Sequence, residues 1–238
     1  MPVDLLSQWS DRSALIHHLN AHFPVAHDSI LVRDLQLDVF SVANPHDQID
    51  RLMGRVVDGD FQWEPFWAQA WPSARELAHW MTAPEKRQQW SGRSVLDLGC
   101  GVGLCGCVAA AMGSTVTLAD YAEPAIWFAA ANAWPWREHA EAIVLDWHLD
   151  QLPTKYDCIL GADIVYEQRN WSALANFFSN QITDSGQIIL TEPGRDTGET
   201  FQDYLRPLGW SVTSSVLTTL TNGRPLRLIV ATRAPTQT

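Results

Sequence analysis

The sequence predicts an α/β protein with a doubly wound, mostly parallel sheet, an antiparallel C-terminal strand, and an N-terminal extension made of a helix and a β-hairpin. Three observations support this prediction. From residue 93 onward, short apolar runs alternate with helical stretches, as in a parallel sheet that helices cover on both faces. A glycine-rich turn directly follows the first run. The last two runs have only a tight turn between them, which indicates an antiparallel hairpin.

Seven apolar runs are expected to form the strands of the sheet. Right-handed crossovers between the parallel strands then fix the winding. A short helix over residues 201–205 ends before Pro207, because proline cannot continue a helix. The turn of the C-terminal hairpin falls at Asn222 and Gly223. The seven runs cover residues 94–98, 114–118, 142–145, 156–161, 187–190, 210–216 and 226–231.

The N-terminal part has helical and hairpin patterns. Apolar residues from Leu5 to Leu19 recur near helical spacing. Two further apolar runs flank Arg33 and Asp34, and the second alternates with polar residues, which indicates a hairpin that turns there. Pro72 lies in the first turn of a later helix, where proline is favoured. The expected elements are a helical segment over 1–25, hairpin strands at 30–32 and 35–42, and helices over 46–57 and 72–81.

The composition limits the possible functions. A chain of 238 residues suits one α/β domain with a modest extension. With 16 Lys and Arg against 27 Asp and Glu, the net charge of −11 makes nucleic acid a poor partner. We find no signal-peptide pattern, and no apolar run approaches the ~20 residues of a membrane span. The four cysteines lack C-x-x-C spacing and the eight histidines lack metal-ligand spacing, so we expect a reduced, cytoplasmic protein without a metal.

Glycines at alternate positions follow the first strand of the predicted sheet. Gly99, Gly101 and Gly103 would let the chain turn sharply and bring bare backbone close to a ligand. Gly101, Gly103 and Gly106 also satisfy the G-x-G-x-x-G pattern of dinucleotide-binding proteins, which alone is a weak signal. The loop therefore predicts a nucleotide-like cofactor.

Three aspartates are predicted to end parallel strands, at the edge where ligands bind in such sheets. The Asp97 carboxylate would repel a pyrophosphate but could receive the ammonium group of a methionine moiety. Asp120 could hold two ribose hydroxyls, as acids also do in NAD enzymes. Asp146 could accept a hydrogen bond from an adenine amino group, with Trp147 packed on the base. Together these residues favour S-adenosylmethionine over NAD.

The stretch from about Trp63 to Ala231 resembles the seven-β-strand S-adenosylmethionine-dependent methyltransferases, whose sheet is Rossmann-like. Within that class, the segment from Asp163 to Tyr166 is similar to the D-x-x-Y motif of a branch of protein lysine methyltransferases. That branch includes enzymes that modify the electron-transfer flavoprotein β-subunit and various chaperones. Residues 65–74 resemble its aromatic segment.

The resemblance implies a domain division and a set of ligands. Residues 63–238 would form the cofactor-binding methyltransferase domain, and residues 1–62 would form the extension. The expected partner is a protein that presents a lysine, and we expect a monomer that binds neither nucleic acid nor a membrane. The expected cofactor contacts are Trp71, Asp97, Gly99, Gly101, Gly103, Asp120, Tyr121, Asp146, Trp147 and Ala162.

Asp163 and Tyr166 are the expected catalytic residues. The strand over 156–161 leads Asp163 to the sheet edge beside the cofactor, and Tyr166 faces the same way if the segment is helical. A carboxylate near a lysine stabilises the cation and opposes the loss of its proton. Asp163 is therefore assigned to orienting the amine rather than to strong general-base catalysis. Tyr166 could accept a hydrogen bond from the amine or contact it with its ring.

Three tryptophans, Trp63, Trp67 and Trp71, recur every four residues. This spacing usually reflects core packing along one helix face. Because Pro65 and Pro72 interrupt a helix, we expect a loop from which Trp71 could reach the site.

The mouth of the site is expected to be acidic, which suits a lysine-bearing surface. Residues 192–195 follow the fifth strand at the same rim and could line the acceptor site. The acidic residues expected there are Glu64, Asp163, Glu167 and Glu192.

Three alternatives stay open: methylation of a small amine or other metabolite, a non-catalytic cofactor-binding module, and an NAD-dependent oxidoreductase. The intact Asp97, Gly101, Asp120 and Asp163 argue against the module, and Asp97 and Asp146 argue against NAD. Enzymes that methylate glutamine amides or adenine amino groups usually show N-P-P-Y where this chain has D-I-V-Y, so those acceptors are not expected.

Overall fold

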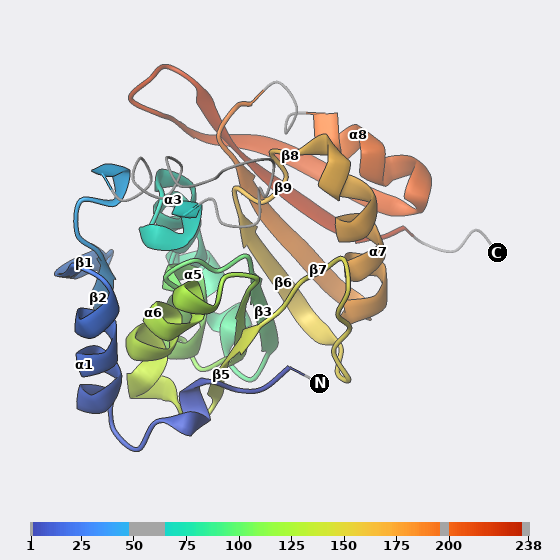
Figure 1. Ribbon diagram of the computed structural model, residues 1–238. Coiled ribbons are helices and arrows are strands. Elements are labelled where there is room, and N and C mark those ends of the chain that lie inside the picture. Colours follow the sequence, from blue (N-terminus) through green and yellow to red (C-terminus); the bar gives the residue numbers. More distant parts are fainter. Residues whose placement is uncertain (1, 48–64, 196–199, 235–238) are drawn as a thin grey trace, which may run out of the picture.

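The computed structural model describes residues 2–47, 65–195 and 200–234. Within these residues, the main sheet has seven strands in the order β5-β4-β3-β6-β7-β9-β8, and a separate two-stranded sheet pairs β1 with β2 (Figure 1). The strands are β1 (Val25–Val32), β2 (Leu35–Val42), β3 (Ser94–Leu98), β4 (Thr115–Asp120), β5 (Ala140–Val144), β6 (Tyr156–Ala162), β7 (Ile182–Glu192), β8 (Trp210–Thr219) and β9 (Pro225–Arg233).

The strand order confirms the predicted topology. Strands β3 to β7 are parallel to one another, and β9 is antiparallel to both β7 and β8. The chain goes from β7 to β8 at the edge of the sheet and then returns, so that β9 inserts between them. The turn of this hairpin lies at Asn222 and Gly223, as predicted, and Gly223 has a φ of 80°.

Helices cover both faces of the main sheet (Figure 1). On one face lie α5 and α6, against which α1 and α3 pack, and on the other lie α7 and α8. The α-helices are α1 (Arg12–His22), α3 (Pro72–Met81), α4 (Pro84–Arg87), α5 (Leu104–Ala111), α6 (Glu123–Ala133), α7 (Trp171–Gln181) and α8 (Phe201–Leu205). The short 3-10 helices are η1 (Leu6–Gln8), η3 (Pro65–Ala68), η4 (Gln88–Trp90), η5 (Trp134–Trp136), η6 (Gln168–Asn170) and η8 (Arg206–Leu208).

Each face of the sheet carries its own apolar core. In β3, Val95 belongs to the core beneath α5 and α6, whereas Leu96 and Leu98 belong to the core beneath α7 and α8. A strand that is buried on both faces needs apolar residues at successive positions, which is why the parallel strands appear in the sequence as continuous apolar runs. In the part of the chain that the structure describes, no helix is both long and apolar enough to cross a membrane.

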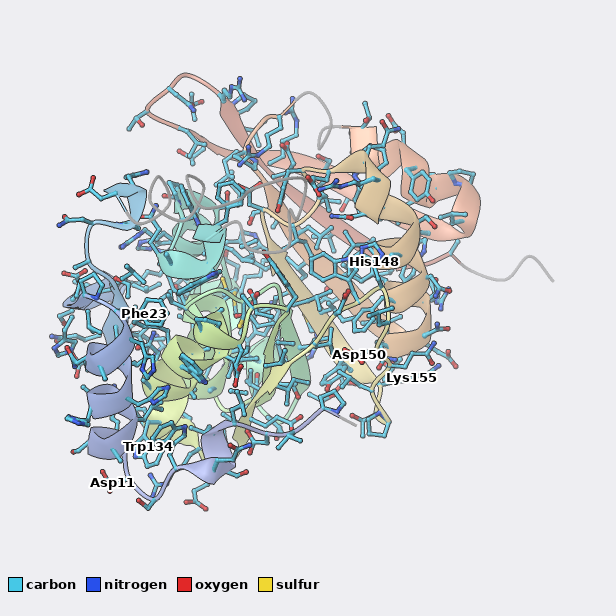
Figure 2. The ribbon with its side chains drawn as sticks, in the orientation of Figure 1. Asp11, Phe23, Trp134, His148, Asp150 and Lys155 are labelled. Carbon is cyan, nitrogen blue, oxygen red and sulfur yellow. The ribbon has the colours of Figure 1, made fainter. Side chains whose placement is uncertain are left out.

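The N-terminal helix is shorter than predicted. It begins at Arg12 because the side chain of Asp11 accepts a hydrogen bond from Ala14 N at 2.8 Å and caps the helix (Asp11 is labelled in Figure 2). The residues before this cap form the short η1 and an extended stretch, and the helix ends at His22. The prediction of a helical segment over 1–25 is therefore wrong at both ends.

Asp4 and Leu5 lie against the outer edge of the main sheet. Asp4 forms an antiparallel bridge with Ile143 of β5, and Leu5 N donates to the carbonyl oxygen of Ala142 at 2.8 Å. The Asp4 carboxylate also accepts hydrogen bonds from Ala142 N at 2.9 Å and Leu6 N at 3.0 Å. This segment therefore covers part of the edge of β5.

The remaining N-terminal predictions have different outcomes. The hairpin and its turn at Arg33 and Asp34 are confirmed, although β1 begins earlier than expected, at Val25. The helix over 72–81 is confirmed as α3. From residue 48 onward, the helix predicted over 46–57 lies outside the described residues, as do Trp63, Glu64 and the predicted domain boundary after residue 62.

Candidate active site

The carboxyl ends of the parallel strands border a cavity of about 370 Å³. The glycine loop after β3, the end of β4, the loop after β6 and the segment before α3 all line it. Its volume lies within the range of small-molecule and cofactor pockets. Gly103 and Asp146 lie outside the lining. The other predicted site residues line it together: Trp71, Asp97, Gly99, Gly101, Asp120, Tyr121, Trp147, Ala162, Asp163 and Tyr166.

The glycine loop adopts left-handed conformations that other residues rarely adopt. The φ angles are 63° at Gly99, 54° at Gly101 and 81° at Gly103. A Cβ on Gly99 would approach Cγ2 of Ile164 to 2.7 Å, and one on Gly103 would approach Cδ2 of Leu118 to 2.6 Å. Bare backbone is therefore required at both positions. Gly99 and Gly101 present it to the cavity, whereas Gly103 packs against the sheet.

Asp120 supports this loop from the end of β4. Its carboxylate accepts hydrogen bonds from Gly101 N at 2.9 Å and Ala122 N at 3.0 Å. Burial raises the pKa of Asp120 to about 6, although these donors act in the opposite direction. Because each carboxylate oxygen can accept more than one hydrogen bond, Asp120 can still bind hydroxyl groups of a ligand in the cavity.

Asp97 lies at the end of β3 and is only 2% exposed. It accepts a hydrogen bond from Gly106 N at 2.7 Å, which connects β3 to α5. Burial raises the pKa of Asp97 to about 7; the Gly106 donor opposes this shift and the nearby Asp120 adds to it. The hydrogen bond between Asp97 and Gly106 was not predicted from the sequence, and Asp97 nevertheless lines the cavity.

The loop after β5 brings Trp147 to the cavity, whereas Asp146 lies outside its lining. Asp146 Oδ1 accepts a hydrogen bond from His148 N at 2.8 Å, and Asp146 N donates to Asp150 Oδ2 at 2.9 Å. His148 and Asp150 are labelled on this loop in Figure 2. The buried Trp147 Nε1 has no hydrogen-bond partner within the described part of the chain. The turn explains why the two neighbours differ in their access to the cavity.

Asp163 and Tyr166 both line the cavity, although the segment that connects them is not helical. Asp163 directly follows β6 with a φ of 60°, a left-handed conformation that aspartate tolerates better than most residues. Burial raises the pKa of the Asp163 carboxyl, and Arg195 opposes this shift. The segment from Asp163 to Tyr166 is irregular, but the two residues between them are buried, and both ends line the cavity.

Arg195 is a partner of Asp163 that the sequence analysis did not identify. Arg195 Nε donates to Asp163 Oδ1 at 3.1 Å, and Nη2 donates to Oδ2 at 2.8 Å. The guanidinium also lies 5.6 Å from the centre of the Tyr166 ring. Of the segment 192–195, Arg195 lines the cavity, whereas Glu192 is fully buried beneath the turn.

The two described tryptophans before α3 have different environments. Trp67 is 8% exposed, and its ring centre lies 5.6 Å from that of Phe23, which is labelled in Figure 2. Trp67 and Trp71 both line the cavity together with Phe66, and Trp71 is the more exposed of the two. The rings of Phe66 and Tyr166 lie 6.2 Å apart and nearly perpendicular. Aromatic rings therefore border the cavity next to Asp163.

Residues 65–206, more than half of the chain, match the model of a protein family described as lysine methyltransferase. This chain belongs to the lysine methyltransferase family. This chain is similar to the protein N-lysine methyltransferase METTL21A of Danio rerio, with 44% identity over 108 residues. The aligned residues cover 42% of this chain and 49% of that protein. It is also similar to EEF1A lysine methyltransferase 3 of Mus musculus, with 31% identity over 147 residues, or 59% of this chain and 62% of that protein. The chain therefore spans less than two thirds of the length of either relative.

The fold of this lysine methyltransferase family member is shared with solved structures. The 1,6-didemethyltoxoflavin-N1-methyltransferase of Burkholderia thailandensis matches 87% of this chain and 100% of its own, with a TM-score of 0.59 and 17% identity. This likeness confirms the Rossmann-like α/β class. Family and fold imply S-adenosylmethionine as the cofactor. The site fits it, because Gly99 and Gly101 offer a bare backbone cradle and Asp120 offers a carboxylate for hydroxyl groups.

Proposed function

We propose that the chain transfers a methyl group from S-adenosylmethionine to the side-chain nitrogen of a lysine on a protein. The observation that carries this proposal is that Asp163 and Tyr166, the D-x-x-Y pair, line the same cavity as the glycine loop in a member of the lysine methyltransferase family. The names of the two similar relatives support a protein substrate. We also propose that, within this family, the chain belongs to the D-x-x-Y branch that includes the enzymes that modify the electron-transfer flavoprotein β-subunit.

The cofactor would lie along the carboxyl ends of β3, β4 and β5. Gly99 and Gly101 would bring backbone close to it, and Asp120 would accept hydrogen bonds from the ribose hydroxyls. Trp147 would pack on the adenine, and Asp97 would provide negative charge for the methionine ammonium. The other proposed cofactor residues are Trp71, Tyr121 and Ala162, which line the cavity, and Gly103 and Asp146, which shape the loops beside it.

When bound, the cofactor supplies an electrophilic methyl group on a positively charged sulfur. The acceptor amine would first lose a proton to solvent water, which frees its lone pair for the new N–C bond; the electrons of the C–S bond that breaks would stay with sulfur. Asp163 would orient the amine at near-attack distance through a hydrogen bond. Tyr166 and Phe66 would border the acceptor with aromatic rings and help to exclude water.

A small amine is the second candidate acceptor. The rings of Phe66 and Tyr166 contact each other where they line the cavity with Asp163, and an acceptor position bordered by aromatic rings would also suit a compact substrate. The net charge of −11 instead favours attraction of a basic protein surface, and Glu167 lines the cavity as predicted. Protein methylation should then slow as salt rises, because screening weakens attraction between exposed charges.

The deciding experiment combines the protein with methyl-labelled S-adenosylmethionine and either a proteome extract or its small-metabolite fraction. We expect label in a protein band, recovered as methyl-lysine after hydrolysis. Label that appears only in the low-molecular-weight fraction would replace the protein acceptor with a metabolite. Label on a different amino acid of a protein would retain the protein substrate but refute lysine.

A further inference from the structure

The acceptor presents a chemical problem that Asp163 alone makes worse. A free lysine has a pKa of about 10.4, so it is almost entirely protonated at neutral pH and lacks the lone pair that methyl transfer needs. An unpaired carboxylate in a buried site would raise the pKa of that lysine further by stabilising its cation. An isolated Asp163 would therefore bind the acceptor mainly in its unreactive form.

Arg195 changes the charge of this position. Its guanidinium engages both Asp163 oxygens at 3.1 and 2.8 Å, the two-pronged geometry of a strong charge-assisted pair. The Asp163 side chain is 15% exposed and that of Arg195 46%, so the carboxylate is the more sheltered partner. Together they carry no net charge, yet each carboxylate oxygen keeps a lone pair that can accept a hydrogen bond from an amine.

The turn after β7 fixes where Arg195 lies. The buried Glu192 carboxylate accepts hydrogen bonds from Gly194 N at 2.9 Å and Arg195 N at 2.5 Å. Gly194 has a φ of 68°, and a Cβ there would lie 2.8 Å from the carbonyl oxygen of Pro225. The turn therefore favours glycine at position 194, and its hydrogen bonds to Glu192 fix the backbone from which the Arg195 side chain reaches Asp163.

We propose that Arg195 is a positioning residue that neutralises Asp163, so that Asp163 orients the acceptor amine without holding it as a cation. This inference rests on the proposed methyl transfer to an amine. Arg195 also contacts the ring of Tyr166, at 5.6 Å from its centre, and so joins both residues of the D-x-x-Y pair. Its effect on the reaction acts through Asp163 and through the protonation of the acceptor.

Other titratable groups near Asp163 set the background for a pH measurement. The pKa of Glu192 is raised by burial, while its hydrogen bonds to the turn oppose that shift. Burial also raises the pKa of the nearby thiols Cys100 and Cys105, which stay neutral across the pH range of interest. Among the described residues, Glu192 lies beneath the turn, where Arg227 acts on it. The charged or titratable groups that line the cavity with Asp163 are Asp97, Cys100, Cys105, Asp120, Tyr121, Tyr166, Glu167 and Arg195.

The test measures kcat against pH for Arg195→Gln and Arg195→Lys with saturating acceptor, since the acid limb then reports deprotonation in the bound complex. In Arg195→Gln we expect this limb to move up by at least ~1 pH unit, which lowers kcat near neutral pH by ~10-fold or more and restores it at high pH. The limb of Arg195→Lys, which keeps the charge, should stay near that of wild type. The matched control is Arg87→Gln. Arg87 also pairs with both oxygens of an aspartate, Asp34 on the hairpin turn, and its replacement should leave the acid limb of the kcat profile unchanged.

Two further measurements separate this role from a structural one. In the cofactor-free protein, ¹³C NMR should show a higher pKa for the Asp163 carboxyl in Arg195→Gln than in wild type. Urea unfolding checks that the variants fold, and Arg195→Met, which keeps an apolar contact with Tyr166, provides a second neutral variant.

An equal loss of kcat at every pH, with the acid limb unmoved, would overturn the inference. If wild type forms methyl-lysine and the limb does not move, only the role of Arg195 is wrong. If wild type forms no methylated amine, the proposed function itself fails.

Discussion

Asn132 of α6 and Phe40 of the hairpin exchange two buried hydrogen bonds: Phe40 N donates to Asn132 Oδ1 at 2.7 Å, and Asn132 Nδ2 donates to Phe40 O at 2.9 Å. The same Nδ2 donates to Val102 O in the glycine loop at 2.8 Å. One side chain therefore connects the N-terminal hairpin to the loop that borders the cofactor cavity.

Replacing Asn132 by leucine should lower the free energy of unfolding by about 3 kcal/mol or more, because three buried backbone groups would lose their partner at ~1–3 kcal/mol each. Urea unfolding measures this loss. Asn20→Ala is the control: Asn20 is exposed and bonds only within its own helix among the described contacts, so its replacement should change stability by less than ~0.5 kcal/mol. A loss below ~1 kcal/mol for Asn132→Leu would contradict this prediction.

Alanine at Gly99 should impair cofactor binding beyond its effect on the backbone. Gly99 and Gly92 both have positive φ, at 63° and 74°, so alanine at either costs ~1–2 kcal/mol in conformation. A Cβ at Gly92 meets nothing within 4 Å, whereas one at Gly99 would lie 2.7 Å from Ile164 Cγ2. We expect Gly99→Ala to weaken S-adenosylmethionine binding at least ~10-fold by calorimetry, about 1.4 kcal/mol, and Gly92→Ala to leave it unchanged. Equal weakening in both variants would refute this reading of the loop.

Asp163→Asn should separate chemistry from cofactor binding. Asparagine also tolerates the left-handed conformation at this position, so the backbone should persist. Turnover should fall by ~100-fold, which is the lower end of what a well-positioned acid–base group typically contributes. The Kd for the cofactor should stay within a few-fold of wild type. Asp203→Asn on α8, which removes an exposed carboxylate paired with Arg206, is the control. Full activity of Asp163→Asn would remove Asp163 from the proposed mechanism.

Stability of the cofactor-free protein should depend on pH through Asp97. Burial raises its pKa to about 7, so the folded protein holds a proton that the unfolded chain, with an ordinary pKa of about 3.9, releases. The stabilisation is complete below about pH 4 and is lost as pH rises through about 7. Between pH 5 and 8, this group should lower the free energy of unfolding by roughly 2–3 kcal/mol.

Urea unfolding of wild type and Asp97→Asn across that range isolates the contribution of Asp97. Asparagine keeps an acceptor for Gly106 N but does not titrate. The decline of stability with pH should be shallower in the variant, and what remains includes Asp120, whose raised pKa of about 6 acts in the same direction. Equal slopes would show that Asp97 does not hold a proton in the folded state.

The strands of the sheet were predictable wherever burial on both faces requires apolar residues. The start of β7 was not, because residues 183–186 are mostly polar and coincide with a shift in register between Tyr156 and Cys158 of the neighbouring strand. The start of α1 was misjudged because apolar spacing extends through residues that the Asp11 cap excludes from the helix. Local hydrogen bonding determines where β7 and α1 begin, and the spacing of apolar residues in the sequence does not show these hydrogen bonds.

Residues of the candidate site were predictable where a single short segment of the sequence already indicates a ligand. Alternating glycines after a strand and an aspartate such as Asp120 at a strand end each indicate a ligand without knowledge of the fold. The pair of Arg195 and Asp163 could not be found this way, because its members are 32 residues apart and meet only through the pairing of β6 with β7. Similarly, the hydrogen bonds of Asp146 with Asp150 and His148 form only in the folded loop.

The bridge from Asp4 to β5 has a consequence for the behaviour of the protein in concentrated solution. A strand edge with unpaired N–H and C=O groups is a template on which other chains can add strands and aggregate. By accepting a hydrogen bond from Ala142 N, the Asp4 carboxylate occupies a group that such a strand would need, and it places negative charge beside it. We therefore expect resistance to aggregation at this edge to depend on Asp4, a residue far along the chain from the proposed methyl-transfer site.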